Sequence, residues 1–366
     1  MRLLDRHILA ELIGPFLFGV AAFTSLMFAG KELFKLTELL TECRVPLVTA
    51  AELMALHIPS LVVVTLPMAM LLAALLAFGR LSGDSEVVAL FACGVSLYRV
   101  VLPVIALSVV VTALSFVLNE IVVPQTNSMH ERIFQELKDE PPPTAKPFLV
   151  VDADNGTTNS VIYVQEGFDP STQTMRDVWV VQYWNNKPAM FVYGREATWK
   201  AGTEWSFRDG YEKIIGEKGI GNGQTVTVSF RESRTVKIGK TPDQLALYQK
   251  KHDELSFSQL REYIRMLQSQ GAEVNEYRVR LYEKISLPLA SLVFALIGTP
   301  LGLRPHRSSS AMGLGLAIVI IFAYWVFMHY MTILGNTGAM SPAAASFIPT
   351  LAGACVGIAL IARAAK

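Results

Sequence analysis

The chain has 366 residues, of which 52% are hydrophobic and only 17% are charged, and its formal net charge is +1. Soluble domains carry about a quarter charged residues, so this composition favours a membrane protein, and the small net charge gives no reason to expect a nucleic-acid partner. The cysteines Cys43, Cys93 and Cys355 lie in or beside apolar segments. Their spacing fits neither a disulfide framework nor a zinc site.

Both ends of the chain contain uncharged stretches long enough to cross a bilayer, which takes about 20 helical residues. Four of these stretches are 12–30, 53–79, 100–119 and 285–303. A fifth, 308–362, has no Asp, Glu, Lys or Arg and is too long for one helix. Turn-forming residues at 335–338 and the pair Ser341-Pro342 predict that it divides into two spans. We therefore expect six transmembrane helices.

Basic residues are distributed unequally between the two ends of these spans. If the N-terminus lies inside the cell, the cytoplasmic segments carry Arg2, Arg6, Arg80, Arg99, Arg304, Arg307, Arg363 and Lys366. The opposite short loops carry Lys31, Lys35 and Arg44, which glutamates in the same loops offset. The positive-inside rule therefore predicts a multi-pass protein of the bacterial inner membrane, with both termini in the cytoplasm and the central polar block in the periplasm.

The central block alternates with period two from about residue 148 to residue 238 and is rich in β-branched and aromatic residues. The candidate strands are 148–151, 161–167, 177–184, 189–193, 204–208, 212–215 and 225–230. The turns expected to separate them are Asn155-Gly156, Asp169-Pro170, Asn185-Asn186, Asp209-Gly210 and Gly221–Gly223. Many short strands at near-regular spacing predict an all-β domain of the sandwich or jellyroll kind.

The expected fold class is thus an α-helical membrane protein with six transmembrane helices, three before and three after an inserted periplasmic, jellyroll-like β-domain. Residues 1–124 form the first three transmembrane helices, 125–280 the β-domain with its connectors, and 281–366 the last three helices. Pro141-Pro142-Pro143 predicts a stiff connector into the β-domain, and a helical period over 245–270 leads back to the membrane.

No catalytic constellation stands out in the sequence. The six histidines are scattered, and neither a metalloprotease motif, nor a nucleophile elbow, nor a phosphate-binding loop with its lysine occurs. We therefore expect no catalytic residue, no metal site and no cofactor bound by this chain. If the protein uses ATP and Mg²⁺, a separate subunit must bind them.

The loop after the second span is the most suggestive cytoplasmic segment. Ser82 or Asp84 can cap a short helix over about 82–93, and Glu86 then lies in its first turn, where a negative charge is favoured. The residues that would form its apolar face are Val87, Val88, Leu90 and Phe91. Such a helix can dock into a cytoplasmic motor subunit and pass its motion to the spans. The alternative is an ordinary solvated loop.

Two lysines mark the outer end of the first span. Lys31 and Lys35 lie four residues apart and therefore on one helix face. They can pair with lipid phosphates, or they can simply anchor the helix at the membrane surface. Glu32 and Glu38 are close enough in sequence to neutralise them, which favours the anchor.

These features occur in an order that resembles the lipopolysaccharide export permeases of the LptF/LptG family, the membrane subunits of an ABC transporter. The likeness covers essentially the whole chain. Its motifs are Leu4-Asp5-Arg6-His7-Ile8 before Pro15-Phe16, Leu66-Pro67-Met68, Ser85-Glu86-Val87, Ala92-Cys93-Gly94-Val95-Ser96, Leu255-Ser256, Leu260-Arg261-Glu262-Tyr263-Ile264 and Lys284-Ile285-Ser286-Leu287-Pro288-Leu289. The order and spacing of these motifs, together with the topology, carry the resemblance.

The resemblance implies a mechanism and a set of partners. Two permease chains, as a homodimer or an LptF/LptG-type heterodimer, would enclose a cavity above a dimer of cytoplasmic ATPases. Lipopolysaccharide would enter sideways and be pushed into the β-jellyroll domains and a periplasmic bridge protein. The resemblance implies that Glu86 contacts the ATPase with help from Asp84 and Arg80. It also implies that Lys31 meets a lipid phosphate.

Three functions are then to be distinguished. The first is the export permease. In it, Val87 and Leu90 belong to the helix that contacts the ATPase, and Lys35, one turn beyond Lys31, is a second candidate for binding lipid phosphate. The second is a mechanotransmitting or sensor subunit that carries no lipid. The third, a membrane-embedded enzyme, is disfavoured because the spans contain no clusters of His, Asp or Glu.

Overall fold

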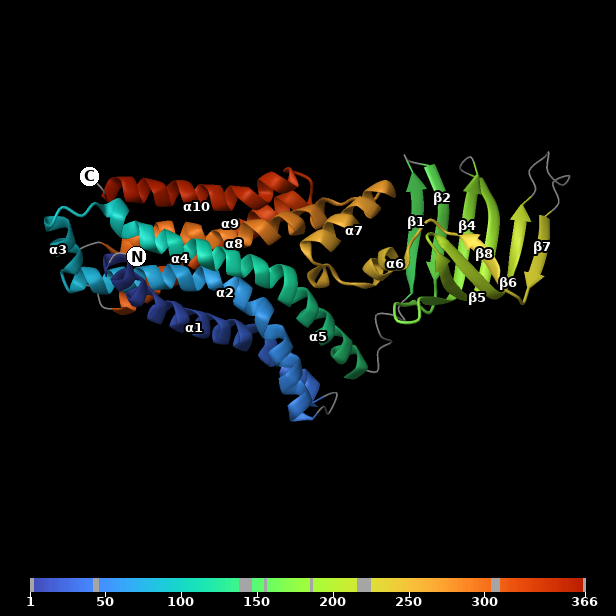
Figure 1. Ribbon diagram of the computed structural model, residues 1–366, viewed down its shortest axis with the longest axis horizontal. Helices are drawn as coiled ribbons and strands as arrows, with labels where there is room; N and C mark the ends of the chain where they lie inside the picture. The colour runs from blue at the N-terminus through green and yellow to red at the C-terminus, as the bar shows by residue number, and fades with distance from the viewer. Residues whose placement is uncertain are drawn as a thin grey trace. The chain divides into compact units, whose positions relative to one another are not determined.

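The computed structural model describes residues 3–41, 46–137, 147–154, 157–184, 187–215, 225–303 and 310–364. The chain forms two compact units (Figure 1). The first unit combines Met1–Asn127 with Asn275–Lys366, and the second is Ser128–Val274. The proline connector expected at 141–143 lies outside the described residues.

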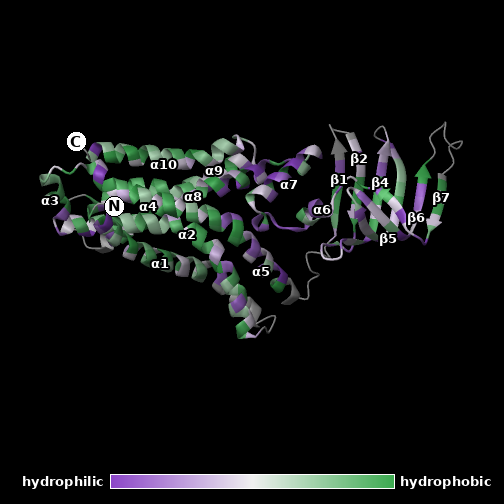
Figure 2. Ribbon diagram, viewed as in Figure 1, coloured by the Kyte–Doolittle hydropathy of each residue, from purple (hydrophilic) through white to green (hydrophobic). Residues whose placement is uncertain are grey.

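The first unit is a bundle of long helices. Its helices are α1 (Leu3–Thr41), α2 (Leu47–Gly83), α3 (Glu86–Ala92), α4 (Leu97–Val117), the π-helical turn η1 (Leu118–Val122), α5 (Val123–Leu137), α8 (Asn275–Gly302), α9 (Ser310–Asn336) and α10 (Pro342–Ala364). Six helical stretches are long and apolar enough to cross a membrane, which confirms the predicted number of spans. Figure 2 shows their predominantly hydrophobic residues. The predicted break between the last two spans is also confirmed, since α9 ends at Asn336 and α10 begins at Pro342.

Helix α8 forms the centre of this bundle, because α2, α4 and α10 all pack against it. Its contact with α2 depends on two glycines one turn apart, Gly298 and Gly302. A Cβ atom added at Gly298 would lie 2.8 Å from the Cβ of Ala74, and one at Gly302 would lie 2.8 Å from the Cβ of Phe78. Small residues at this spacing let two helix backbones approach closely, which is how helices associate where lipid removes the hydrophobic driving force.

The same device joins α10 to the opposite side of α8. A Cβ atom at Gly353 would lie 2.5 Å from Cγ1 of Val293, and one at Gly357 would lie 2.7 Å from the Cβ of Leu296. Helix α8 is therefore held by glycine contacts on two sides. In α2, most residues from Leu61 to Phe78 are buried, and the helices packed against α2 are mainly α1, α8 and α9.

We expect Gly298→Val to separate α8 from α2, because its side chain has no space against Ala74. Such overpacking typically costs about 1–3 kcal/mol. The thermal midpoint of the detergent-solubilised protein, followed by size-exclusion chromatography, should fall. Gly315→Val is the matched control, since a Cβ atom at Gly315 in α9 meets nothing within 4 Å. Equal midpoints for the two variants would contradict the close contact.

The second unit contains one antiparallel sheet. Its strands are β1 (Phe148–Asp154), β2 (Thr157–Val164), β3 (Phe168–Asp169), β4 (Thr174–Trp184), β5 (Lys187–Ala201), β6 (Glu204–Ile215), β7 (Thr225–Phe230) and β8 (Arg234–Lys237). They pair in the order β1-β2-β4-β5-β6-β7, with β3 on β4 and β8 on β6. The predicted fold class, six apolar helices with an inserted β-domain, is confirmed. The short strands β3 and β8 were not predicted from the sequence.

The predicted turn at Asp209-Gly210 is wrong, because β6 continues through both residues. Asp209 has a φ of 52°, and Asp177 on β4 has a φ of 48°. In the sheet ladder, the residues on both sides of Asp177, Arg195 and Asp209 are paired, but these three residues, on the neighbouring strands β4, β5 and β6, are not. A row of such irregularities bends a sheet. Gly210 is required beside this row, since a Cβ atom there would lie 1.9 Å from the carbonyl oxygen of Tyr193.

The core of the sheet is closed by the segment that follows β8. Trp205 is fully buried against Phe168, and its indole nitrogen donates a hydrogen bond of 3.0 Å to the carbonyl oxygen of Lys240. The Lys240 ammonium lies 2.9 Å from Oδ1 of Asp152 on β1. Helices α6 (Pro242–Gln249) and α7 (Phe257–Ser269) follow, and each begins with a capping box. The helical period predicted over 245–270 thus belongs to two helices.

A carboxyl group is buried in the turn that connects these two helices. Glu254, in the 3-10 turn η4 (His252–Glu254), is only 7% exposed. Burial raises the pKa of its carboxyl from the usual 4.5 to about 7, the nearby Glu131 adds to the increase, and the backbone N–H of Lys251 opposes it. The protonated form therefore favours the fold fully below pH 4.5, and this contribution is lost as the pH rises through 7.

We expect Glu254→Gln to remove this pH dependence. The variant should be more stable than the original protein by about 1–2 kcal/mol at pH 8, because it buries no charge, and should match it at about pH 4.5. Thermal unfolding of the full chain in detergent at both pH values measures the difference. Glu166→Gln, at an exposed position in the same unit, is the control. A stability difference for Glu254→Gln that is the same at both pH values would contradict the assignment.

Candidate functional site

The candidate site is the end of the helical bundle where α2 gives way to the short helix α3. Helix α2 ends at Gly83, and the backbone N–H of Asp84 donates to the carbonyl oxygens of Arg80 and Ser82. Ser85 then takes a φ of 61° and occupies the N-cap of α3, without a side-chain hydrogen bond. The predicted short helix is therefore present over Glu86–Ala92, but the expectation that Ser82 or Asp84 caps it is wrong, because both residues complete α2.

The first turns of α1 meet this segment through charged side chains. Nε2 of His7 lies 2.9 Å from Oε2 of Glu86 at the start of α3. One turn further along α1, Oε2 of Glu11 lies 2.7 Å from an Nη atom of Arg80 at the end of α2. These two contacts and a third, between Asp5 and Arg99, form a set that we call the ionic junction.

The third contact of the ionic junction joins α1 to α4. Oδ1 of Asp5 lies 2.6 Å from an Nη atom of Arg99, in the first turn of α4. Thus the start of α1 contacts charged residues from α2, α3 and α4 within about two turns. Asp5, His7 and Glu11 were not predicted as site residues from the sequence. The available signal was the presence of three titratable residues within seven positions at the start of the first span, but their partners lie 69 to 94 positions away.

The predicted coupling residues take different positions in this site. The side chains of Glu86 and Arg80 are partly exposed, at 46% and 67%, although both belong to the ionic junction. Asp84 is exposed and Leu90 is half-buried. Val87 is different: it is buried in a cluster with Ile8 and other residues of α1, α2 and α4. Val87 therefore anchors α3 to the bundle and offers no surface to a partner.

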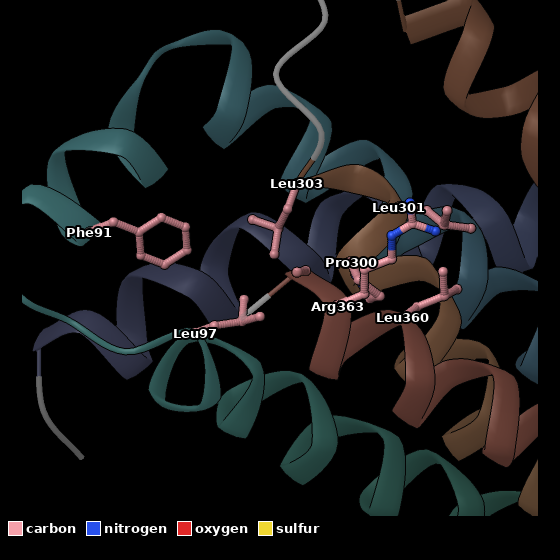
Figure 3. A pocket seen from close by; sticks show the side chains of 8 residues that line it. Phe91, Leu97, Pro300, Leu301, Leu303, Leu360 and Arg363 are labelled. Carbon is pink, nitrogen blue, oxygen red and sulfur yellow. The ribbon is translucent and has the colours of Figure 1, made fainter. Parts of the chain in front are cut away.

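Apolar side chains of α3 that the fold leaves exposed lie beside a pocket. Val88 is 56% exposed and Phe91 is 40% exposed. The pocket has a volume of about 280 Å³ and is open to one side (Figure 3). Its lining residues are Phe91, Leu97, Pro300, Leu301, Leu303, Leu360, Arg363 and Ala364. The ends of α3, α8 and α10 and the start of α4 thus form one apolar hollow, in which Arg363 is the one basic residue among those that the structure describes.

Both chain termini belong to this end of the bundle. The ionic junction places the start of α1 there, and Arg363 and Ala364 place the end of α10 there. In Figure 1 the N and C labels accordingly lie near α3. The basic side chains Arg80, Arg99 and Arg363 gather at the same end.

The predicted lipid-phosphate residues lie in α1, toward its other end. Lys31 and Lys35 are one turn apart in this helix, but their side chains lie outside the described part of the structure. Their neighbour Glu32 is described and is almost fully buried. Its Oε1 lies 3.3 Å from Nε2 of His57 on α2. Glu32 therefore contacts α2.

Metal binding has no candidate among the described residues, since these contain no group of three or more His, Cys, Asp or Glu that could hold an ion. What the site offers is a short helix with exposed apolar and acidic groups, whose Glu86 contacts His7 of the first span, beside an ion pair between Arg80 and Glu11 of that span. Such an arrangement can transmit motion from a bound protein to the bundle.

Comparison with known proteins agrees with this geometry. The chain is 27% identical over 311 residues to the lipopolysaccharide export system permease protein LptG of Escherichia coli K12, covering 81% of this chain and 82% of the relative. It is 24% identical over 306 residues to the protein of the same name from Haemophilus influenzae, covering 81% and 80%. The family model described as lipopolysaccharide export system permease LptF/LptG matches residues 6–363. That match extends over nearly the whole chain, and the protein therefore belongs to the LptF/LptG family of lipopolysaccharide export permeases, the membrane subunits of an ABC transporter.

Proposed function

We propose that this chain extracts lipopolysaccharide from the outer leaflet of the bacterial inner membrane and passes it to a periplasmic bridge toward the outer membrane. The observation that carries the proposal is the ionic junction, which ties a short helix with an exposed Glu86 to the first span. A six-span bundle with such a helix has the parts needed to receive force at one end and apply it to lipid.

The energy for extraction must come from elsewhere. Each methylene group of an acyl chain contributes about 0.8 kcal/mol to membrane anchoring, so removing a lipid with several chains costs tens of kcal/mol. The sequence contains no phosphate-binding loop. We therefore propose that a dimer of cytoplasmic ATPases binds ATP and Mg²⁺ and drives this chain.

The proposed orientation places the end that bears α3 and both termini in the cytoplasm. Arg80, Arg99 and Arg363 support it, because basic residues are retained on the cytoplasmic side. The second unit begins within α5 and ends just before α8. Because α4 begins and α8 ends beside α3, both connections to the second unit leave the opposite end of the bundle. In this orientation the β-domain lies in the periplasm, where it can hand the lipid on.

The proposed coupling runs from the ATPase through Glu86 and into α1. Glu86, Asp84, Arg80 and Leu90 form the contact surface, and Val87 fixes α3 to the bundle. Exposed ion pairs stabilise a fold by only about 0–1 kcal/mol each. The importance of the ionic junction therefore lies in holding α1 to the moving segment, so that α1 follows when α3 shifts.

Exchanging the charges of one pair tests this role of the junction. We expect Arg80→Glu to lower ATP-driven lipid release about tenfold, because the introduced carboxylate would repel Glu11, and the double variant Arg80→Glu with Glu11→Arg to recover most of the release. Thermal stability should change little in either variant. If the double variant is as inactive as the single one, the contact of Arg80 with the ATPase is what matters, and its pair with Glu11 does not pass motion to α1.

The family implies a second permease chain, and we propose that the functional unit is a pair, either two copies of this chain or this chain with an LptF-like partner. The relatives named LptG favour the LptG-like role in such a pair. Exposed apolar side chains on α1 and α9, such as Leu17, Phe18 and Phe322, supply surfaces for the second chain or for lipid. We further propose that Lys31 and Lys35 meet the phosphates of the entering lipid.

Reconstitution tests the whole proposal. In proteoliposomes that contain this chain, its partner permease and the ATPase, lipopolysaccharide should stimulate ATP hydrolysis and should be released to an acceptor bridge protein. We expect Lys31→Glu combined with Lys35→Glu to reduce photocrosslinking of the lipid to α1 several-fold, because the charge reversal repels phosphate. Lys200→Glu, at an exposed position of β5, is the control. ATPase stimulation without lipid release would favour the sensor function instead.

A further inference from the structure

The second unit contains a basic pocket that the coupling site and the lysines of α1 do not involve. It lies between the segment after β8 and helix α7, and its volume is about 620 Å³. This volume is within the range of small-molecule sites. The lining residues are Lys240, Gln244, Phe257, Ser258, Arg261, Glu262, Arg265, Met266 and Ser269.

One wall of the pocket is fixed by buried polar contacts. Lys240 is 6% exposed and is neutralised by Asp152 at 2.9 Å. Its carbonyl oxygen accepts the hydrogen bond from the indole of Trp205 in the core of the sheet. Gln244, the next lining residue, is held in the capping box of α6. This side of the pocket therefore has little freedom to rearrange.

The opposite wall is one face of α7. The buried residues of this helix, Leu260 and Ile264, face the interior of the unit, so that Arg261 and Arg265 fall on the exposed face four residues apart. Like charges at this spacing repel each other and destabilise a helix by a few tenths of a kcal/mol. Among the residues that the structure describes, neither guanidinium makes an ion pair with a carboxylate.

The charge of the pocket therefore favours an anion. Lys240 is neutralised within the fold, and two guanidinium groups face a single lining carboxylate, Glu262. Guanidinium groups bind phosphate oxygens in a bidentate manner and are more suited to phosphate than an ammonium group. Phe257 and Met266 add apolar surface beside these charges, which suits a ligand that carries a phosphate next to a less polar body.

We propose that this pocket binds a phosphate group on the head of the transported lipid, through Arg261 and Arg265. The proposal rests on the proposed function and adds a second phosphate-binding station to it. Only residues 270–274 separate α7 from helix α8 in the chain. A phosphate held here would be a second contact, in addition to the one proposed on α1.

Site-specific photocrosslinking in the assembled transporter tests the proposal. A photoreactive amino acid at Ser258 or Ser269, which line the pocket, should form an ATP-dependent adduct with lipopolysaccharide in proteoliposomes that contain phosphatidylglycerol. We expect Arg261→Gln combined with Arg265→Gln to reduce this adduct at least about fivefold. The matched control is Arg176→Gln combined with Arg231→Gln, which removes two exposed arginines of the same unit outside the pocket.

A second arm keeps all arginines in place and changes the lipid. Enzymatically dephosphorylated lipopolysaccharide should form the adduct at least about fivefold less well than the phosphorylated lipid. An equal adduct with both lipids, or an adduct only with phosphatidylglycerol, would overturn the proposal, as would an adduct that is unchanged in Arg261→Gln with Arg265→Gln. If lipid release proceeds while no adduct forms at Ser258 or Ser269, this inference fails alone; if ATP drives no release at all, the proposed function fails as well.

Discussion

The architecture of the bundle depends on the close approach of α8 to α2 and α10. Within a bilayer, apolar side chains gain nothing from facing each other instead of lipid, so helices associate through backbone proximity and close packing. Gly298 and Gly302 provide that proximity toward α2, and Gly353 and Gly357 provide it from α10. Because α2 is held in this way over its buried length, its end beside α3 has a fixed position from which α3 projects. A helix that transmits force must be mounted on something rigid.

The ionic junction adds a different kind of contact at the end of this rigid core. Its three pairs are short but partly exposed, and such pairs break and re-form at small energetic cost. Helix α1 is itself packed along α2, with Ile8, Leu12 and Phe23 buried, so the junction adds contacts that can rearrange to a span that packing already holds. Val87 belongs to the rigid part, whereas Glu86 one position earlier belongs to the junction. Neighbouring residues of α3 therefore have separate tasks.

The second unit follows the same division between a fixed framework and an accessible surface. The sheet ladder is interrupted at the row of Asp177, Arg195 and Asp209, and the Trp205 indole in the core donates a hydrogen bond to the carbonyl oxygen of Lys240. The buried pair of Lys240 and Asp152 then neutralises the base of the basic pocket. The arginines of α7 are left available because no described carboxylate pairs with them. A pocket that is rigid on one side and positively charged on the other is suited to transient binding of an anion during transport.

The sequence by itself determined which segments enter the membrane and which do not. Hydropathy decides that question locally, because about 20 consecutive apolar residues are favoured in lipid wherever the rest of the chain lies. The six spans, the break between α9 and α10, the β-domain and the short helix around Glu86 were all predicted, because each depends on a pattern of neighbouring residues in the sequence. Only the tertiary structure decided the partners of His7, Glu11 and Asp5, the glycine contacts of α8, the course of β6 through Asp209 and the pocket around Arg261 and Arg265. Each of these joins residues whose proximity depends on how distant elements pack, and a local pattern contains no information about that packing.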